Sequence, residues 1–121
     1  MRISYEWDFG EDEALAKKLA QLVLEGQKKA TTGLYQAGQQ IPKIGECAAI
    51  VDSDKKRLCV IQYTRVEIKP FLEVDYDFAQ KEGEGDADIE EWREKHRKFF
   101  KLTSDDVKVL CEEFVVTKSF R

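Results

Sequence analysis

The chain has 121 residues, with 24 acidic against 20 basic side chains and a net charge of -4. A chain of this length is expected to form one domain, residues 1–121. The acidic balance argues against a general binder of duplex nucleic acid, which carries an excess of Lys and Arg. The sequence has no apolar run long enough to span a membrane and no recognisable signal peptide, so it predicts a cytoplasmic protein with no membrane partner.

The cysteines and the single histidine form no recognisable metal or disulfide pattern. Cys47, Cys59 and Cys111 are odd in number and widely spaced, and each lies in an apolar run. We expect all three to be buried, unpaired thiols. A site with several histidines is excluded because His96 is the only histidine. We therefore expect neither a metal nor a cofactor.

The first predicted element is an amphipathic helix from about Asp12 to Glu25, preceded by a short aromatic segment, 5–10. Acidic residues at its beginning favour a helix N-terminus. Apolar side chains recur at helical spacing at Leu15, Leu19, Leu22 and Val23. Gly26 then ends the helix, since glycine readily adopts the conformation that a helix end requires.

The segment after Gly26 brings a lysine and a hydroxyl close together. Lys28 offers a positive charge or a base, and Thr31, three residues later, offers a nucleophile or a hydrogen-bond donor. The alternative interpretation is a helix end followed by a solvated loop. The next residues, 33–40, are ambiguous between a short helix and a strand.

A β-hairpin is predicted next, from a buried strand at Cys47–Val51 and a longer strand at Leu58–Ile68 that is rich in β-branched residues. Residues 52–55 form its turn, and residues 69–71 close it. Residues 74–81 then favour a short helix. This helix ends at an acidic turn, Glu82-Gly83-Glu84-Gly85-Asp86.

A second helix follows the acidic turn, capped by Asp86 or Asp88. One face of it carries Ile89, Trp92, His96, Phe99 and Phe100. We expect this face to pack in the core, with the ring nitrogens of His96 hydrogen-bonded. Residues 107–117 favour one or two strands, with Glu112-Glu113 as a bulge or an exposed edge. The order of elements predicts a small α+β domain around a mostly antiparallel sheet.

Gly26-x-Lys28-x-x-Thr31, placed after an amphipathic helix, resembles the signature of the ASCH family. Other segments match a longer branch of that family: Trp7-x-Phe9-Gly10, Leu34-Tyr35, Ile41-Pro42-Lys43-Ile44-Gly45, Val66-x-Ile68-x-Pro70-Phe71, Val74-Asp75, Ala79-x-x-Glu82-Gly83-Glu84-Gly85-Asp86, Trp92-Arg93-x-x-His96 and Phe99-Phe100. The resemblance runs from about Trp7 to Val116. It implies a PUA-like, mostly antiparallel β-barrel with flanking helices.

The resemblance also implies a function. The family is proposed to bind RNA or nucleosides in the cleft that holds the signature, and some short bacterial members remove the acetyl group of N4-acetylcytidine. Other members have been described as ribonucleases. Carried over by motif, the catalytic positions of the amidohydrolase branch are Lys28, Thr31 and Glu82. The implied partner is a nucleoside or single-stranded RNA.

The chemistry of these three residues is coherent. A threonine hydroxyl that attacks an amide needs a base, and a lysine can replace histidine in that role if burial or a neighbouring cation favours its neutral form. Glu82 would orient the lysine or protonate the leaving amine. Such a hydrolase needs no metal. We expect substrate contacts from Gly26, Lys29, Arg65, Glu84, Asp86 and Arg93.

Two features depart from the short amidohydrolases that the chain resembles. They carry an arginine two residues after the threonine, where this chain has Gly33, and they lack the acidic turn, which would reshape the cleft. Two alternatives therefore stand beside the amidohydrolase: an RNA- or nucleotide-binding module without catalysis, and a ribonuclease. A carboxylate within reach of Lys28 would favour the hydrolase.

Overall fold

The computed structural model describes residues 2–9 and 13–120. In chain order they form β1 (Ile3–Trp7), α1 (Glu13–Leu24), β2 (Ala30–Leu34), β3 (Cys47–Val51), β4 (Arg57–Pro70), a short 3-10 helix (Phe71–Glu73), α2 (Tyr76–Lys81), α3 (Ile89–Phe100) and β5 (Lys108–Ser119). Among these residues, no helix is both long and apolar enough to cross a membrane.

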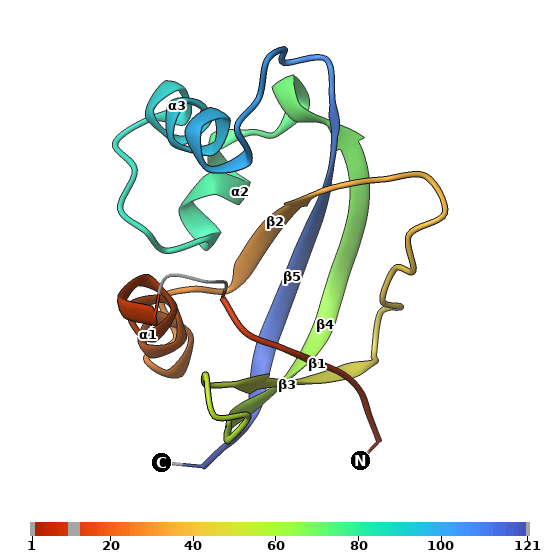
Figure 1. Cartoon of the computed structure of the whole chain (residues 1–121), viewed down its shortest axis with the longest axis vertical. Coiled ribbons are helices and arrows are strands. Elements are labelled where there is room, and N and C mark those ends of the chain that lie inside the picture. The colour runs from red at the N-terminus through yellow and green to blue at the C-terminus, as the bar shows by residue number, and fades with distance from the viewer. Residues whose placement is uncertain (1, 10–12, 121) are drawn as a thin grey trace.

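The strands form one sheet in the order β1-β3-β4-β5-β2. The β1–β3 pair is parallel, and the other neighbouring pairs are antiparallel. The long β4–β5 ladder runs the length of the molecule, with the helices on one side of it (Figure 1). The mixed α+β class and the mostly antiparallel sheet are therefore as the sequence predicted.

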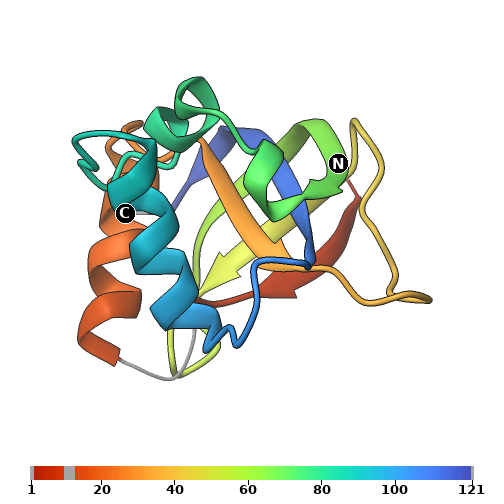
Figure 2. The ribbon, with the colours of Figure 1, turned by 90° about the horizontal axis from the view of Figure 1, so that it is seen from above.

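The closed barrel that the resemblance implied is not shown. Within the described residues the strand order ends at β1 on one side and at β2 on the other. Seen from above, the sheet is strongly curved instead of flat (Figure 2). The sheet is thus curled but open between its two edge strands. Residues of both edges line one cleft, which is described below.

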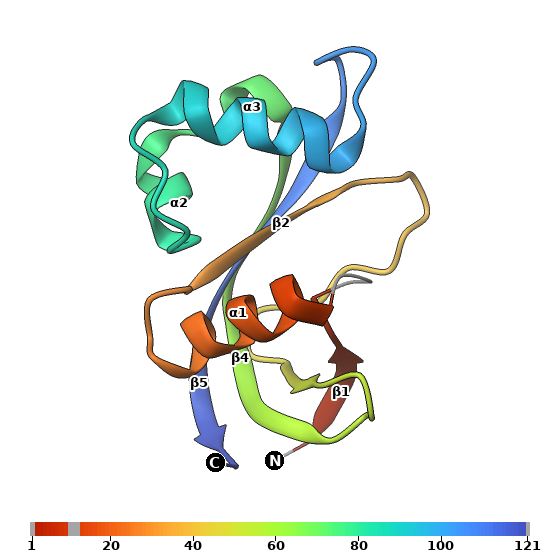
Figure 3. The ribbon, with the colours of Figure 1, turned by 60° about the vertical axis from the view of Figure 1, so that its left-hand side comes forward.

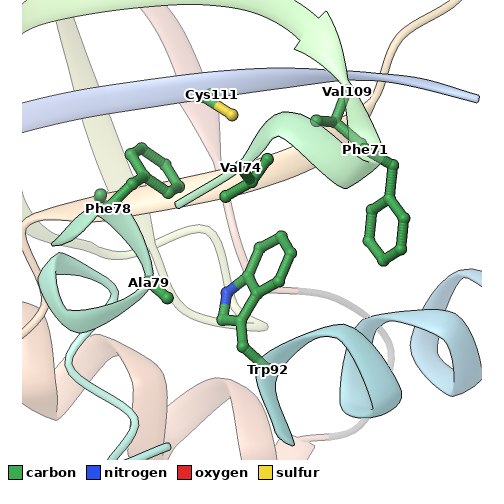
Figure 4. Close-up of a cluster of buried hydrophobic side chains, with 8 residues drawn as sticks. Phe71, Val74, Phe78, Ala79, Trp92, Val109 and Cys111 are labelled. Atoms are coloured by element: carbon green, nitrogen blue, oxygen red, sulfur yellow. The ribbon is translucent and has the colours of Figure 1, made fainter. Parts of the chain in front are cut away.

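Two apolar clusters cover the two faces of the sheet. One is centred on Trp92, which packs with side chains from the 3-10 helix, α2 and β5 (Figure 4). The other contains Val23 of α1 with residues of β3, β4 and β5, and side chains of β1 pack against it. The thiols of Cys47, Cys59 and Cys111 are buried and free, as predicted.

The end of α1 sets the position of the signature segment. Gly26 has φ +83 and donates its N–H to the carbonyl of Val23 at 3.0 Å. The chain then turns directly into β2, so Lys28 is buried and Thr31 lies within a strand. The interpretation as a solvated loop is therefore wrong. Gly33 and Leu34 also belong to this strand, which resolves the first residues of the ambiguous segment.

The remaining elements follow the predicted order, with differences in their bounds and pairing. The helix expected from about Asp12 to Glu25 spans Glu13–Leu24, and Asp12 lies outside the described residues. The aromatic lead-in contains β1, which pairs with β3. Glu112-Glu113 is neither a bulge nor an edge: β5 lies between β4 and β2, and the nearby register shift falls in β4 between Tyr63 and Arg65.

Both helices after the hairpin begin at an aspartate cap, and Asp88 of α3 is one of the two caps that the sequence predicted. Asp75 accepts a hydrogen bond from the N–H of Phe78 at 2.9 Å, and Asp88 accepts one from Glu91 at 2.8 Å. An N-cap of this kind stabilises a helix by about 1 kcal/mol because it satisfies a backbone donor that would otherwise lack a partner. The acidic turn lies between the end of α2 and the cap of α3.

Candidate functional site

A cleft of about 600 Å³ lies between α1, α3 and the two edge strands. Figure 3 shows β2 crossing between α3 and α1. Lys28, Thr31 and Glu82 all line this cleft, although Glu82 lies more than fifty positions further along the chain. Aromatic side chains of Tyr5, Trp7, Phe9, Tyr63 and Phe99 also line it. The cleft volume is in the range of ordinary small-molecule sites, about 300–1,000 Å³.

Gly83 brings the acidic turn against the signature segment. It has φ +70, and a Cβ at this position would lie 2.2 Å from the carbonyl oxygen of Gln27. Only glycine allows two backbones to approach this closely with this φ. The N–H of Lys29 also donates to the carbonyl of Lys81 at 2.7 Å. The end of α2 is thereby docked beside Lys28, which places Glu82 next to the lysine.

Lys28 is held by two carboxylates. Its Nζ lies 3.9 Å from Glu82 Oε1 and 3.1 Å from Glu84 Oε2, and it donates to the backbone carbonyl of Glu82 at 3.4 Å. Lys28 and Glu82 are each only 2% exposed, so this is a buried ion pair. A lysine ammonium has three N–H donors, of which these hydrogen bonds use two. The third N–H has no hydrogen-bond acceptor among the described residues.

Glu82 binds α3 as well as Lys28. Its Oε2 accepts a hydrogen bond from the indole N–H of Trp92 and lies 3.3 Å from Nε2 of His96. The other ring nitrogen of His96, Nδ1, donates to the backbone carbonyl of Trp92 at 2.8 Å. An imidazole that donates from both nitrogens carries a positive charge. Glu82 thus lies between two cations.

These contacts decide the charge states of Glu82 and His96. Burial alone would raise the pKa of Glu82, but the hydrogen bond from His96, the charge of Lys28 and the Trp92 N–H together lower it below its ordinary value. Burial alone would lower the pKa of His96, but the hydrogen bond and charge of Glu82 raise it above its ordinary value. Glu82 is therefore ionised at neutral pH.

A further carboxyl group, that of Glu112, faces the cleft from the sheet. In the register of β2 and β5, Thr31 pairs with Glu112, and both side chains line the cleft. Directly opposed residues of antiparallel strands have Cβ atoms about 4.5–5.5 Å apart and project to the same face. Glu112 and the hydroxyl of Thr31 are therefore neighbours on the cleft wall.

Glu112 differs from Glu82 in having no partner. Within the described residues, no hydrogen bond or ion pair reaches its carboxyl group, which is half-buried. Burial without a compensating charge raises the pKa of Glu112 to about 7. This group can accept and return a proton near neutral pH.

Comparison with known proteins decides the family. The model of the ASCH domain family matches residues 5–118. The chain belongs to the ASCH domain family. No curated protein matches it.

Solved ASCH domains share the fold. An ASCH domain from Lactobacillus crispatus JV V101 is 32% identical, with a TM-score of 0.84 over 94% of this chain and 79% of that chain. Protein EF3133 from Enterococcus faecalis V583 is also 32% identical, with a TM-score of 0.84 over 99% of this chain and 84% of that chain. A mutant of an ASCH protein from Zymomonas mobilis, at 11% identity and a TM-score of 0.61 over 87% of this chain and 68% of that chain, shows the fold alone.

The residues expected to bind substrate in this ASCH domain divide into two groups. Glu84 and Asp86 line the cleft, where Glu84 binds Lys28 and Asp86 lies 2.7 Å from the ammonium of Lys95. The other four lie outside the cleft lining: Gly26, Lys29, Arg65 and Arg93.

Each of these four has a different position or partner. Gly26 forms the end of α1, and the side chain of Lys29 is exposed. Arg65 pairs with Glu67 and with Glu113, the latter at 3.7 Å. Arg93 donates to the carbonyl of Leu72 at 3.1 Å. Neither arginine completes the cleft.

The structure also adds cleft residues to the sequence prediction. Glu112 was missed because its role depends on pairing with a strand eighty positions earlier. His96 was expected in the core with hydrogen-bonded ring nitrogens; the hydrogen bonds are confirmed, and the ring also lines the cleft. Trp92 is a core residue, at 0% exposed. The prediction for Phe99 is wrong, since it is 65% exposed at the cleft. Among the described residues no cluster of three or more potential ligands is arranged for a metal ion.

Proposed function

We propose that this ASCH domain is a metal-independent amidohydrolase that removes the acetyl group from N4-acetylcytidine or a closely related acylated nucleoside. One observation carries the proposal: the buried Lys28–Glu82 pair and the hydroxyl of Thr31 line the same cleft. The cleft therefore offers both a nucleophile and a fixed positive charge, which is the combination that acyl transfer from an amide requires.

The walls of the cleft favour a nucleoside as the substrate. Tyr5, Trp7 and Phe99 provide aromatic surface against which a base can pack. Acidic side chains outnumber basic ones along the lining: Glu6, Asp8, Glu82, Glu84, Asp86 and Glu112 against Lys28, Lys95 and His96. A polyanionic RNA backbone would be repelled by this charge, whereas an uncharged nucleoside would not. The lining thus favours a nucleoside hydrolase over a ribonuclease.

Each of the three residues has a distinct role in the proposed reaction. Thr31 is the nucleophile that attacks the acetyl carbonyl. Lys28 presents its remaining N–H to the carbonyl oxygen and stabilises the negative charge that develops there. Glu82 holds Lys28 in place through the ion pair and fixes α3 through Trp92 and His96. The sequence assigned Lys28 the role of base, but its two carboxylate partners favour a role as a fixed cation.

One observation favours a second candidate, a nucleoside-binding module without catalysis. Lys28 is engaged by two carboxylates, an arrangement that suits a fixed cation better than a proton acceptor. If no other base served Thr31, the cleft would bind a nucleoside and leave its amide intact. Turnover by the purified protein separates the two candidates.

The test is spectrophotometric conversion of N4-acetylcytidine to cytidine by the wild type and by single variants. Thr31→Ala and Lys28→Ala should each abolish turnover, and the double variant should be little worse, because groups that act as a unit are not additive. Activity should survive EDTA, since side chains supply both the nucleophile and the charge. Cytidine should still bind to Thr31→Ala. Wild-type turnover no faster than that of Thr31→Ala would rule out the hydrolase and leave the binding module.

A further inference from the structure

The proposed hydrolase lacks an assigned proton acceptor for Thr31. A neutral hydroxyl attacks an amide poorly unless a base removes its proton during the attack. The other two residues assigned to catalysis do not serve: Lys28 is held by two carboxylates, and Glu82 is held by Lys28, Trp92 and His96. Glu112 is a further carboxyl group of the cleft, and it lies beside Thr31.

We propose that Glu112 is the general base and general acid of this site, exchanging a proton with the hydroxyl of Thr31. The proposal rests on the amidohydrolase function above and names the residue that completes it. Three observations carry it: Glu112 is directly opposite Thr31 in the β2–β5 register, its side chain lines the same cleft, and no described residue pairs with its carboxyl group.

The reach of the side chains fits the proton transfer. With Cβ atoms about 4.5–5.5 Å apart, the longer glutamate side chain can bring a carboxylate oxygen to the threonine hydroxyl. No hydrogen bond joins the two side chains in the structure, and catalytic contacts of this kind commonly tighten when substrate binds. The neighbouring Glu113 cannot substitute, because strand alternation turns it to the opposite face, where it pairs with Lys81 at 2.8 Å.

The proton balance of the reaction closes with this assignment. As the Thr31 oxygen bonds to the acetyl carbon, the hydroxyl proton passes to Glu112. The C–N bond then breaks, and Glu112 returns the proton to the departing amine, giving cytidine and an acetyl ester of Thr31. Water attacks the ester while Glu112 accepts its proton. Glu112 then protonates the Thr31 oxygen as it leaves, and acetic acid is released.

The groups around Glu112 set its pH dependence. The phenols of Tyr5 from β1 and Tyr63 from β4 line the same cleft, and their pKa values are raised mainly by burial, with a smaller contribution from the charge of Glu112. The thiol of Cys111, adjacent on β5, has its pKa raised to about 12, mainly by burial. These three groups stay neutral near pH 7, so they do not compete for the proton. The other charged side chains of the lining are Glu6, Asp8, Lys28, Glu82, Glu84, Asp86, Lys95 and His96.

The test compares Glu112→Gln with the matched variant Glu113→Gln, which removes an equal charge from the opposite face of β5. For Glu112→Gln, kcat should fall about 10²–10⁴-fold, the usual worth of general acid–base catalysis, while the Kd for cytidine stays within about twofold. Wild-type kcat/KM should rise with pH to a plateau above about pH 7, and the residual rate of Glu112→Gln should lose this rise. Glu113→Gln should keep the wild-type rate and profile.

A rescue experiment separates a base from a merely structural side chain. Glu112→Ala opens space for a small carboxylate, so added formate should restore turnover at least about tenfold to Glu112→Ala but not to Thr31→Ala. Wild-type turnover together with a Glu112→Gln rate within about threefold of it and an unchanged pH profile would overturn this inference alone. Absence of turnover by the wild type would overturn the proposed function and this inference together.

Discussion

Two glutamates of one cleft have opposite environments. Glu82 is more deeply buried than Glu112, yet its pKa is lowered, because Lys28, His96 and Trp92 all stabilise the carboxylate. Glu112 is only half-buried, yet its pKa is raised to about 7, because no described residue compensates its charge. The comparison shows that partners, more than depth, decide which carboxyl group holds its proton here.

The difference separates two tasks within the site. A carboxylate that stays ionised can anchor Lys28 and α3 throughout a reaction. A carboxyl group that titrates near neutral pH can take up and release a proton at each turnover. Glu82 suits the first task and Glu112 the second.

The largest expected loss of stability comes from removing the indole of Trp92, which donates a hydrogen bond to Glu82. Trp92→Ala should destabilise the protein by about 3–5 kcal/mol, because it leaves a large cavity and removes an N–H donor from a buried carboxylate. Phe99→Ala, on the exposed side of the same helix, should cost less than about 1 kcal/mol. Denaturant unfolding of both variants measures the difference, and equal losses would mean that Trp92 is not a core residue.

The second largest expected loss of stability comes from breaking the buried ion pair of Lys28 and Glu82. Glu82→Gln should cost about 3–4 kcal/mol at pH 7, since it leaves the charges of Lys28 and His96 buried with one fewer partner. Glu84→Gln removes a partly exposed partner of Lys28 and should cost less than about 1 kcal/mol. Thermal or urea melts compare the two. A small loss for Glu82→Gln would show that the pair contributes little to stability.

The pKa shifts of Glu82 and His96 decide how the stability of the fold depends on pH. A lowered pKa of Glu82 stabilises the fold above the carboxyl's ordinary pKa, and that contribution is lost as pH falls through the folded value. A raised pKa of His96 stabilises the fold below the imidazole's ordinary pKa, and that contribution is lost as pH rises through the folded value. The contact between Glu82 and His96 therefore stabilises the fold most between the ordinary pKa values of the two groups, about 4.3 and 6.5.

A third prediction tests how the acidic turn is docked. Gly83→Ala should cost about 3 kcal/mol, because a Cβ there would overlap the carbonyl of Gln27 and the φ of +70 is strained for alanine. Gly85→Ala has a similar φ of +82 but nothing within 4 Å of the added Cβ, so it should cost about 1 kcal/mol. Urea unfolding of the two variants separates contact from strain. Equal costs would mean that Gly83 does not hold Glu82 beside Lys28.

The smallest expected change in stability is an increase. Glu112→Gln should stabilise the protein by about 1–2 kcal/mol at pH 8, because the half-buried carboxylate has no partner there. A raised pKa means that the folded state holds the proton more tightly, so wild-type stability falls as pH rises from about 4.5 to about 7. The advantage of Glu112→Gln should therefore vanish near pH 4. Urea unfolding at the two pH values checks this, and a destabilised variant at pH 8 would contradict it.

Local patterns in the sequence predicted much of the fold. The apolar spacing of α1, the hairpin of β3 and β4, and the aspartate cap of α3 all depend on residues close together in the chain, and all are confirmed. The strands β1 and β2 were missed. Each is short and contains polar residues, and each becomes a strand only by pairing with a distant partner, β3 or β5.

The candidate site was predictable in part for the same reason. The family resemblance brought Lys28, Thr31 and Glu82 forward, and all three line the cleft. The environment of Glu112 was not predictable, because alternation along β5 and the register with β2 place its carboxyl group in the cleft. A pair of adjacent glutamates in a sequence does not reveal that one faces Lys81 and the other faces Thr31.

The central comparison is tested most directly by titrating the side-chain carboxyl groups by carbon-13 NMR in the wild type, Glu112→Gln and Glu82→Gln. We predict one glutamate signal with a midpoint near pH 7 that is absent from Glu112→Gln, and a signal absent from Glu82→Gln whose midpoint lies below the ordinary value of about 4.3. A Glu112 signal that titrates near 4.3, or a Glu82 signal that titrates above it, would contradict the account.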